Sequence, residues 1–137
     1  MRRMSKFVSI EEHSEAQVAA DTGLGTGFVL PKDIVVYSID GPFFFGAAEY
    51  LEKTLRRSQN RVRTVVIRMG RVPFMDTTGL SALDEIVADF QHMGTRVVLC
   101  EVRVNVIEKL ARAQILARVG ACGVYGTLAK FLTSRSV

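Results

Sequence analysis

Hydrophobic residues follow two different periodicities along most of this chain. From about residue 28 onward, short β-branched runs alternate with stretches whose apolar residues recur every three to four positions. The short runs predict β-strands and the longer stretches predict amphipathic helices. Strands are predicted over 28–30, 34–39, 64–69, 95–100 and, as a stub, 124–125. Helices are predicted over 44–59, 76–93, 106–113 and 127–134.

This alternation of strands and helices defines the expected fold class. Such an order is typical of an α/β layer fold with short crossover connections. The run at 64–69 (TVVIRM) is apolar enough to be a central strand that is covered on both faces. We therefore expect an α/β domain with a small, mainly parallel sheet and about four helices, spanning residues 28–137.

The first 27 residues have a different composition. They contain few large apolar residues and end in three glycines, at positions 23, 25 and 27. Such a segment is typical of a linker or a tail before a domain, here with a loose helical turn around 11–20. The basic opening, residues 1–4, suits a position just after a membrane segment, because Lys and Arg gather on the cytoplasmic side.

The overall composition fits one globular domain. The chain has 137 residues, of which 48% are hydrophobic and 23% are charged, and this length buries a core without a metal or a disulfide. No apolar run approaches the roughly 18–20 residues that span a bilayer. The basic opening is not followed by the apolar region of a signal peptide. We expect a soluble, cytosolic domain.

The positive charge indicates little about partners. The formal net charge is +4, but the arginines are scattered and aromatic residues are not interleaved with them, as a nucleic-acid platform requires. A solvated basic surface, not a nucleic-acid site, is the favoured interpretation. Proximity to an anionic membrane would also tolerate this charge.

Catalytic and metal-binding patterns are missing from the sequence. Its two cysteines (Cys100, Cys122) and two histidines (His13, His92) are not at the spacing of metal ligands. Neither a P-loop, nor a nucleophile elbow, nor a distinctive carboxylate pair occurs. We therefore expect no enzyme, no metal and no obligatory cofactor.

The most informative stretch joins the strand at 64–69 to the next helix. Asp76 is placed to cap that helix, and Thr77, Thr78 and Gly79 follow in its first turn, where amide groups face outward. Two hydroxyls at a helix N-terminus suit an anion or a phosphorylation site. The alternative is structural: Asp76 caps, the threonines fill the first turn, and Gly79 allows close packing on the strand.

Two motifs give a family resemblance. The segment Phe74-Met75-Asp76-Thr77-Thr78-Gly79-Leu80 resembles the D-[ST]-[ST]-G-[LIV] signature of STAS domains, which sulfate transporters share with anti-sigma-factor antagonists. The segment 36–50 (VYSIDGPFFFGAAEY) resembles the Y-x-I-D-G-P-L-F-F-x-x-A-E-Y pattern of the C-terminal STAS domains of SulP-type anion permeases. The likeness covers about residues 34–131. One departure is Ala113-Gln114-Ile115, where the family usually has Ala-Gly-Leu, so we expect a different helix exit there.

The resemblance implies a fold, a surface and a regulatory residue. STAS domains have a small sheet with helices mostly on one side. In the antagonists the hydroxyl residue after the Asp is phosphorylated, and the matching position is Thr77. The candidate binding or regulatory residues are Asp76, Thr77, Thr78, Gly79, Leu80, Asp40, Gly41 and Pro42.

The resemblance also implies a function. It suggests a non-catalytic regulatory domain of a SulP-type (sulfate-class) transporter, tethered through residues 1–27 at the cytoplasmic face of the membrane. The partners would be its own transmembrane permease domain, a second protomer or a cytosolic protein, with weak nucleotide or anion binding at the helix after Asp76. The alternative is a stand-alone anti-sigma-factor antagonist that is switched by phosphorylation at Thr77.

Overall fold

One mixed sheet forms the centre of the molecule. The computed structural model describes residues 2–4, 8–25, 27–57, 62–120 and 123–134. The described strands have the order β1-β2-β3-β4-β5-β6. β1–β2 and β2–β3 pair antiparallel, whereas β3–β4, β4–β5 and β5–β6 pair parallel. The strands are β1 (Arg2–Met4), β2 (Ser9–Glu12), β3 (Ile34–Asp40), β4 (Thr64–Arg71), β5 (Arg96–Cys100) and β6 (Val124–Tyr125).

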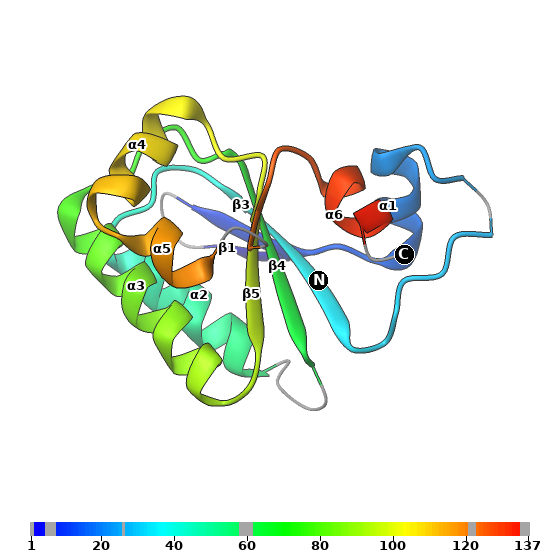
Figure 1. Cartoon of the computed structure of the whole chain (residues 1–137), viewed down its shortest axis with the longest axis horizontal. Helices are drawn as coiled ribbons and strands as arrows, with labels where there is room; N and C mark the ends of the chain where they lie inside the picture. Colours follow the sequence, from blue (N-terminus) through cyan, green and yellow to red (C-terminus); the bar gives the residue numbers. More distant parts are fainter. Residues whose placement is uncertain (1, 5–7, 26, 58–61, 121–122, 135–137) are drawn as a thin grey trace.

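Helices cover both faces of this sheet. They are α1 (Glu15–Thr22), α2 (Phe45–Arg57), α3 (Thr77–His92), α4 (Val104–Arg112), α5 (Ile115–Val119) and α6 (Leu128–Ser134). Figure 1 shows α2, α3, α4 and α5 on one side of the sheet and α1 and α6 on the other. The α/β class and the mainly parallel sheet are confirmed. The described residues form more helices than the four expected, because α1 was expected only as a loose turn around 11–20 and α5 was not expected.

Two apolar clusters hold the layers together. The larger cluster joins the sheet to α2, α3 and α4 and includes Leu51, Leu83, Phe90 and Leu110. The smaller cluster joins the other face to α1 and α6. Its buried members are Val18, Ile34, Val36, Val66, Val98, Cys100, Leu128, Phe131 and Leu132. Because β3, β4 and β5 have an apolar cluster on each face, their sequences are nearly continuous apolar runs.

The N-terminal segment differs from the linker that its composition indicated. β2 pairs with β3 in the register Ile10↔Ile39, and Val8, Ile10 and Val18 are buried. Ser14 and Gln17 form a reciprocal capping box at the start of α1. Residues 8–22 are therefore part of the folded unit and not a tail that precedes it. That this segment follows a transmembrane helix in a longer chain stays a prediction.

Phe28–Leu30, expected to be a strand, is not one. Both edges of β3, the strand that follows this segment, are occupied by β2 and β4, so the segment cannot pair beside β3. Instead the Leu30 amide donates to the Glu15 carboxylate over 2.7 Å, and Phe28 and Leu30 pack against the smaller cluster. The segment is an extended connection that runs across α1 into β3.

The helix exit at Gln114 keeps the geometry that glycine usually provides. Gln114 has φ 63° and ψ 19°, in the left-handed region, directly between α4 and α5. The expectation that glutamine would change this exit is therefore wrong for the backbone: the side chain is different, but the positive φ is retained. The surrounding packing, with Ile115 buried, imposes a conformation that glutamine adopts at some cost.

Candidate functional site

The junction before α3 begins with a helix cap. Asp76 is the N-cap of α3, and its Oδ1 accepts hydrogen bonds from the Gly79 amide over 2.7 Å and from the Thr78 hydroxyl over 2.9 Å. The Leu80 amide donates to the Asp76 carbonyl over 2.9 Å and starts the helical pattern. The carboxylate thus satisfies part of the first turn and places negative charge at the positive end of the helix.

The two predicted segments lie side by side. The Phe43 amide donates to the Phe74 carbonyl over 3.0 Å, and Phe43 and Met75 form a parallel β-bridge. A side chain at Gly79 would fall on the carbonyl oxygen of Phe43, so only glycine permits this approach. The close packing of Gly79 that we considered above is therefore present, here against the loop after β3.

The residues of the earlier loop are held by Arg71. The Gly41 amide donates to the Arg71 carbonyl over 3.0 Å, and the Arg71 guanidinium lies 3.5 Å from the Asp40 carboxylate. Asp40 is exposed at the end of β3, whereas Gly41 and Pro42 are half-buried. The fold thus brings Asp40–Pro42 and Asp76–Leu80 to the same end of the sheet. Contact between the two segments runs through Phe43 and Phe74.

Helix α4 braces the loop between β4 and α3. Three side chains of α4 or its N-cap donate to backbone carbonyls at the end of β4 and in the loop: Arg103 to Gly70 of β4 over 2.9 Å, Asn105 to Pro73 over 2.8 Å and Lys109 to Met75 over 2.7 Å. These bonds fix the loop backbone from one side while the Phe43 bridge fixes it from the other. The junction is consequently a rigid surface and not a loose loop.

The braced junction presents hydroxyls and an aromatic ring to solvent. Thr77 and Thr78 are exposed, and Phe74 is 42% exposed while its ring packs edge-on against Phe44 at 5.4 Å. Leu80, by contrast, is half-buried against the larger cluster. Next to the threonines is a shallow hollow of about 250 Å³, which Ser81, Ala82 and Glu85 also line. The surface suits a protein contact more than enclosure of a small ligand.

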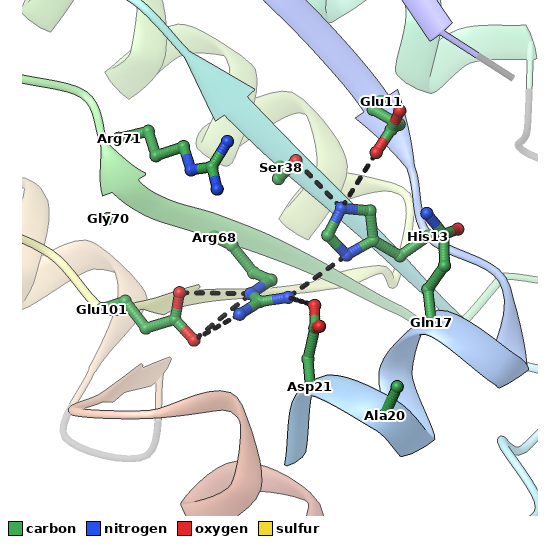
Figure 2. Close-up of a pocket in the computed structure, with 10 residues that line it drawn as sticks. All are labelled: Glu11, His13, Gln17, Ala20, Asp21, Ser38, Arg68, Gly70, Arg71 and Glu101. Atoms are coloured by element: carbon green, nitrogen blue, oxygen red, sulfur yellow. Dashed lines mark hydrogen bonds and ion pairs between the residues drawn. The ribbon is translucent and has the colours of Figure 1, made fainter.

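A second site, which the sequence did not indicate, lies beside α1. A cavity of about 320 Å³ lies toward the carboxyl ends of β3, β4 and β5. Figure 2 shows the side chains that line it, with Arg68 at the centre. Arg68 donates to the Glu101 carboxylate through Nε and Nη2, at 3.0–3.2 Å, and to Asp21 through Nη1 at 2.7 Å. Glu101 also accepts the Leu128 amide of α6 at 3.4 Å.

His13 completes this polar cluster. Its Nδ1 lies 3.2 Å from Arg68 Nη1, and its Nε2 lies 3.1 Å from Ser38 Oγ and 3.4 Å from Glu11 Oε1. Burial and the adjacent Arg68 lower the pKa of His13, against the opposing effect of nearby carboxylates. Burial disfavours the charge of Arg68, but the hydrogen bonds that Arg68 donates to the carboxylates of Glu101 and Asp21 outweigh this effect and raise the pKa of Arg68.

Cys100 lies near the same cluster but is chemically inert there. Its side chain belongs to the smaller apolar cluster. Burial, together with the negative charge of Glu101, raises the pKa of the Cys100 thiol to about 12. The thiol therefore stays protonated at neutral pH, and Cys100 is a buried residue of the core. The other cysteine, Cys122, lies outside the described residues.

The overlooked cluster had one signal in the sequence. Arg68 interrupts an otherwise apolar central strand, and a charged residue at such a position needs charged or polar partners. The partners could not be identified from the chain, because His13, Asp21 and Glu101 are 55, 47 and 33 positions away. Two of the three belong to the segment interpreted as a linker.

The fold and the braced junction define a small α/β domain with a mixed sheet between two layers of helices. Residues 29–130 match the model of the STAS domain, and the chain belongs to this family. The STAS domain of a SulP transporter from Vibrio cholerae is 31% identical and has a TM-score of 0.74, with 89% of this chain and 95% of that chain covered. The family resemblance of the two motifs is thereby confirmed.

Two other relatives widen the comparison. Sulfate transporter 3.2 of Arabidopsis thaliana is 25% identical in an alignment of 111 residues that covers 72% of this chain and 17% of that protein. The anti-sigma factor antagonist SpoIIAA in its unphosphorylated form is 15% identical, with a TM-score of 0.57 over 80% of this chain and 94% of that chain, so it shares the fold alone. The chain spans about a fifth of the length of the curated relatives it matches.

The relatives include membrane transporters, whereas the chain itself contains an α/β domain. Among the helices of the described residues, none is both long and apolar enough to cross a bilayer. The same part of the chain holds no group of three or more His, Cys, Asp or Glu side chains placed to bind a metal ion. The similarity to transporters concerns the STAS domain, which residues 29–130 match.

Proposed function

We propose that this chain is the cytoplasmic regulatory domain of a SulP-type permease for anions of the sulfate class, and that it acts through protein contacts and not through catalysis. The observation that carries this proposal is the 31% identity to a SulP transporter STAS domain over nearly the whole of both chains. The partners would be the transmembrane domain of the same permease, a second protomer or a cytosolic protein. The contact surface would be the braced junction, Asp76–Leu80, with Asp40–Pro42 beside it.

Charge at Thr77 is the proposed control point of this surface. Thr77 is exposed at the first position of α3, and its neighbour Asp76 already carries a negative charge. A phosphate on Thr77 would add about two negative charges and alter docking by repulsion, while the fold is retained. Weak nucleotide or anion binding at the same turn is a further part of the proposal. It would be weak because the Asp76 carboxylate already accepts the Gly79 amide.

The test measures uptake of labelled sulfate by the complete protein that the gene encodes, reconstituted in lipid vesicles. Thr77→Glu is expected to change the uptake rate several-fold while leaving the circular-dichroism spectrum unaltered. Thr133→Glu is the matched control, because Thr133 is an exposed threonine on α6, across the sheet from the junction. Equal uptake by the parent and Thr77→Glu would remove the proposed control point.

The composition of the complete protein distinguishes the alternative. A complete protein without any membrane domain, whose Thr77 is phosphorylated by a partner kinase, would make the chain a stand-alone anti-sigma-factor antagonist. For ligand binding, backbone amide shifts are followed by NMR during addition of ATP, sulfate and phosphate in turn. Shifts concentrated at Asp76–Leu80 would support an anion-binding site there. Unchanged spectra would leave protein contact as the only proposed role of this surface.

A further inference from the structure

Helix α1 is weakly packed on the domain. Val18 is its one buried side chain among the eight residues of the helix. The 320 Å³ cavity lies between α1 and the strand ends, and another of about 500 Å³ lies between α1 and the segment that contains Gly25, Gly27 and Phe28. Hollows on two sides leave α1 few apolar contacts, which places it among the least stable parts of a fold.

Polar contacts to Arg68 make up for this sparse packing. Asp21, in the last turn of α1, accepts from Arg68 Nη1 over 2.7 Å, and His13, just before α1, lies 3.2 Å from the same nitrogen. Arg68 is only a donor, so Nδ1 of His13 must be the acceptor and must carry no proton. The hydrogen of a neutral ring is then on Nε2, which faces Ser38 and Glu11.

The connection after α1 gives it freedom to move. Gly23, Gly25 and Gly27 all have positive φ, at 72°, 77° and 96°, and a Cβ at any of them would meet open space. Glycines in such positions are not wedged against neighbouring atoms, so the connection changes shape at little cost. α1 can therefore swing away once the Leu30 amide also leaves the Glu15 carboxylate, which it contacts over 2.7 Å. β2 and β3 stay joined as far as the bond from the His13 amide to the Val36 carbonyl, 2.8 Å long, and β3 stays paired with β4.

We propose that His13 and Arg68 form an acid-sensitive latch: the neutral ring holds α1 on the sheet, and protonation of the ring releases α1 and opens the cavity. A protonated Nδ1 no longer accepts from Arg68, and its hydrogen points at a guanidinium. Release uncovers the part of the smaller cluster that Val18 covers. This device does not depend on the proposed permease, because all its parts lie in this chain.

The charges around His13 determine the direction of the pH effect. Glu11 on β2, Asp21 on α1, Glu101 after β5 and Arg68 on β4 all act on the ring, and Arg71 at the end of β4 lines the same cavity. Burial and Arg68 prevail over the carboxylates, so the pKa of the docked ring is below the ordinary 6.5. In the released state the pKa of the His13 ring returns to about 6.5, so the released ring binds the proton more tightly than the docked ring. Docking is thus complete above pH 6.5 and is lost as the pH falls through the lowered pKa.

The test is an NMR titration of the whole chain, labelled with ¹⁵N and with ¹³C-histidine, from pH 8 to pH 5. Stopping at pH 5 avoids the range near pH 4 in which carboxylates ordinarily titrate. The His13 ring shifts are expected to titrate below pH 6.5. The heteronuclear NOEs of 15–22 are expected to fall with the same midpoint, while amides of β4 and β5 keep their shifts. α1 remaining rigid at pH 5 while the His13 ring titrates would overturn the latch.

Variants separate the latch from general acid effects. In His13→Asn, the amide oxygen replaces Nδ1 as the acceptor and does not titrate, so α1 should stay rigid at pH 5. His92→Asn is the matched control, because His92 is exposed at the end of α3; it should leave the transition unchanged. Asp21→Asn should move the release to higher pH by weakening the same contact. An unchanged release midpoint in both His13→Asn and Asp21→Asn would assign the transition to other groups.

Discussion

At the scale of single residues, Gln114 holds a conformation that favours glycine. Its φ of 63° costs a residue with a side chain roughly 1–2 kcal/mol, a cost that glycine avoids. Glycine also loses more entropy on folding, which offsets part of the gain. Gln114→Gly is therefore expected to raise the free energy of unfolding by about 1 kcal/mol in urea titrations. Gln114→Ala, which keeps a Cβ, should give no gain, and a less stable glycine variant would contradict this account.

Only some residues of the candidate sites could be predicted from the sequence. Asp76 could be assigned as a cap because its bonds to Thr78 and Gly79 are local and follow from the order of residue types. The Arg68 cluster could not, because its partners meet only after β2, β4 and β5 have assembled. Hydrogen bonds between residues close in sequence can be predicted from the residue types, whereas the members of a polar cluster that are far apart in sequence cannot.

At the scale of elements, the start of α3 depends on its cap. Asp76→Ala removes the carboxylate that accepts hydrogen bonds from the Gly79 amide and from the Thr78 hydroxyl. We therefore expect the free energy of unfolding to fall by about 1 kcal/mol. Asp76→Asn is the matched control, since asparagine caps nearly as well. Thermal and urea unfolding of the three proteins provide the measurement. Alanine and asparagine variants with identical stability would show that the cap contributes little.

The elements differ in how clearly the sequence encodes them. β3, β4, β5, α2, α3 and α6 were all foreseen, because each combines a sustained periodicity with a turn or cap signal. β2 was missed because its four residues, Ser9–Glu12, contain a single large apolar side chain, Ile10. Phe28–Leu30 has the composition of a strand but no partner. A segment with strand propensity therefore forms a strand only where the edge of a neighbouring strand is free to pair with it.

At the scale of the whole molecule, the limits of the family model and of the folded unit differ. The family model matches residues 29–130, yet β2 and α1 precede it and are packed on the domain. β2 covers one edge of β3, and Val8 and Ile10 belong to the larger cluster. α1 contributes Val18 to the smaller cluster, beside α6. Both clusters therefore draw on residues that composition alone assigned to a linker.

A shortened chain tests this difference directly. Removing residues 1–27 exposes an edge of β3 and deletes three buried side chains, Val8, Ile10 and Val18. Full burial of one such side chain stabilises a fold by roughly 1.5–3 kcal/mol. We expect the 28–137 chain to lose about 5 kcal/mol of unfolding free energy, or to fail to fold, in thermal and urea unfolding. Within the full chain, Ile10→Ala should destabilise strongly, whereas Val29→Ala, at a side chain that is 72% exposed, should not. If the shortened chain unfolded at the same midpoint as the parent, residues 8–22 would be a tail that merely rests on the sheet.

The shortened protein should also self-associate, because exposed strand edges pair with other chains. Light scattering at matched concentrations measures that effect separately from stability.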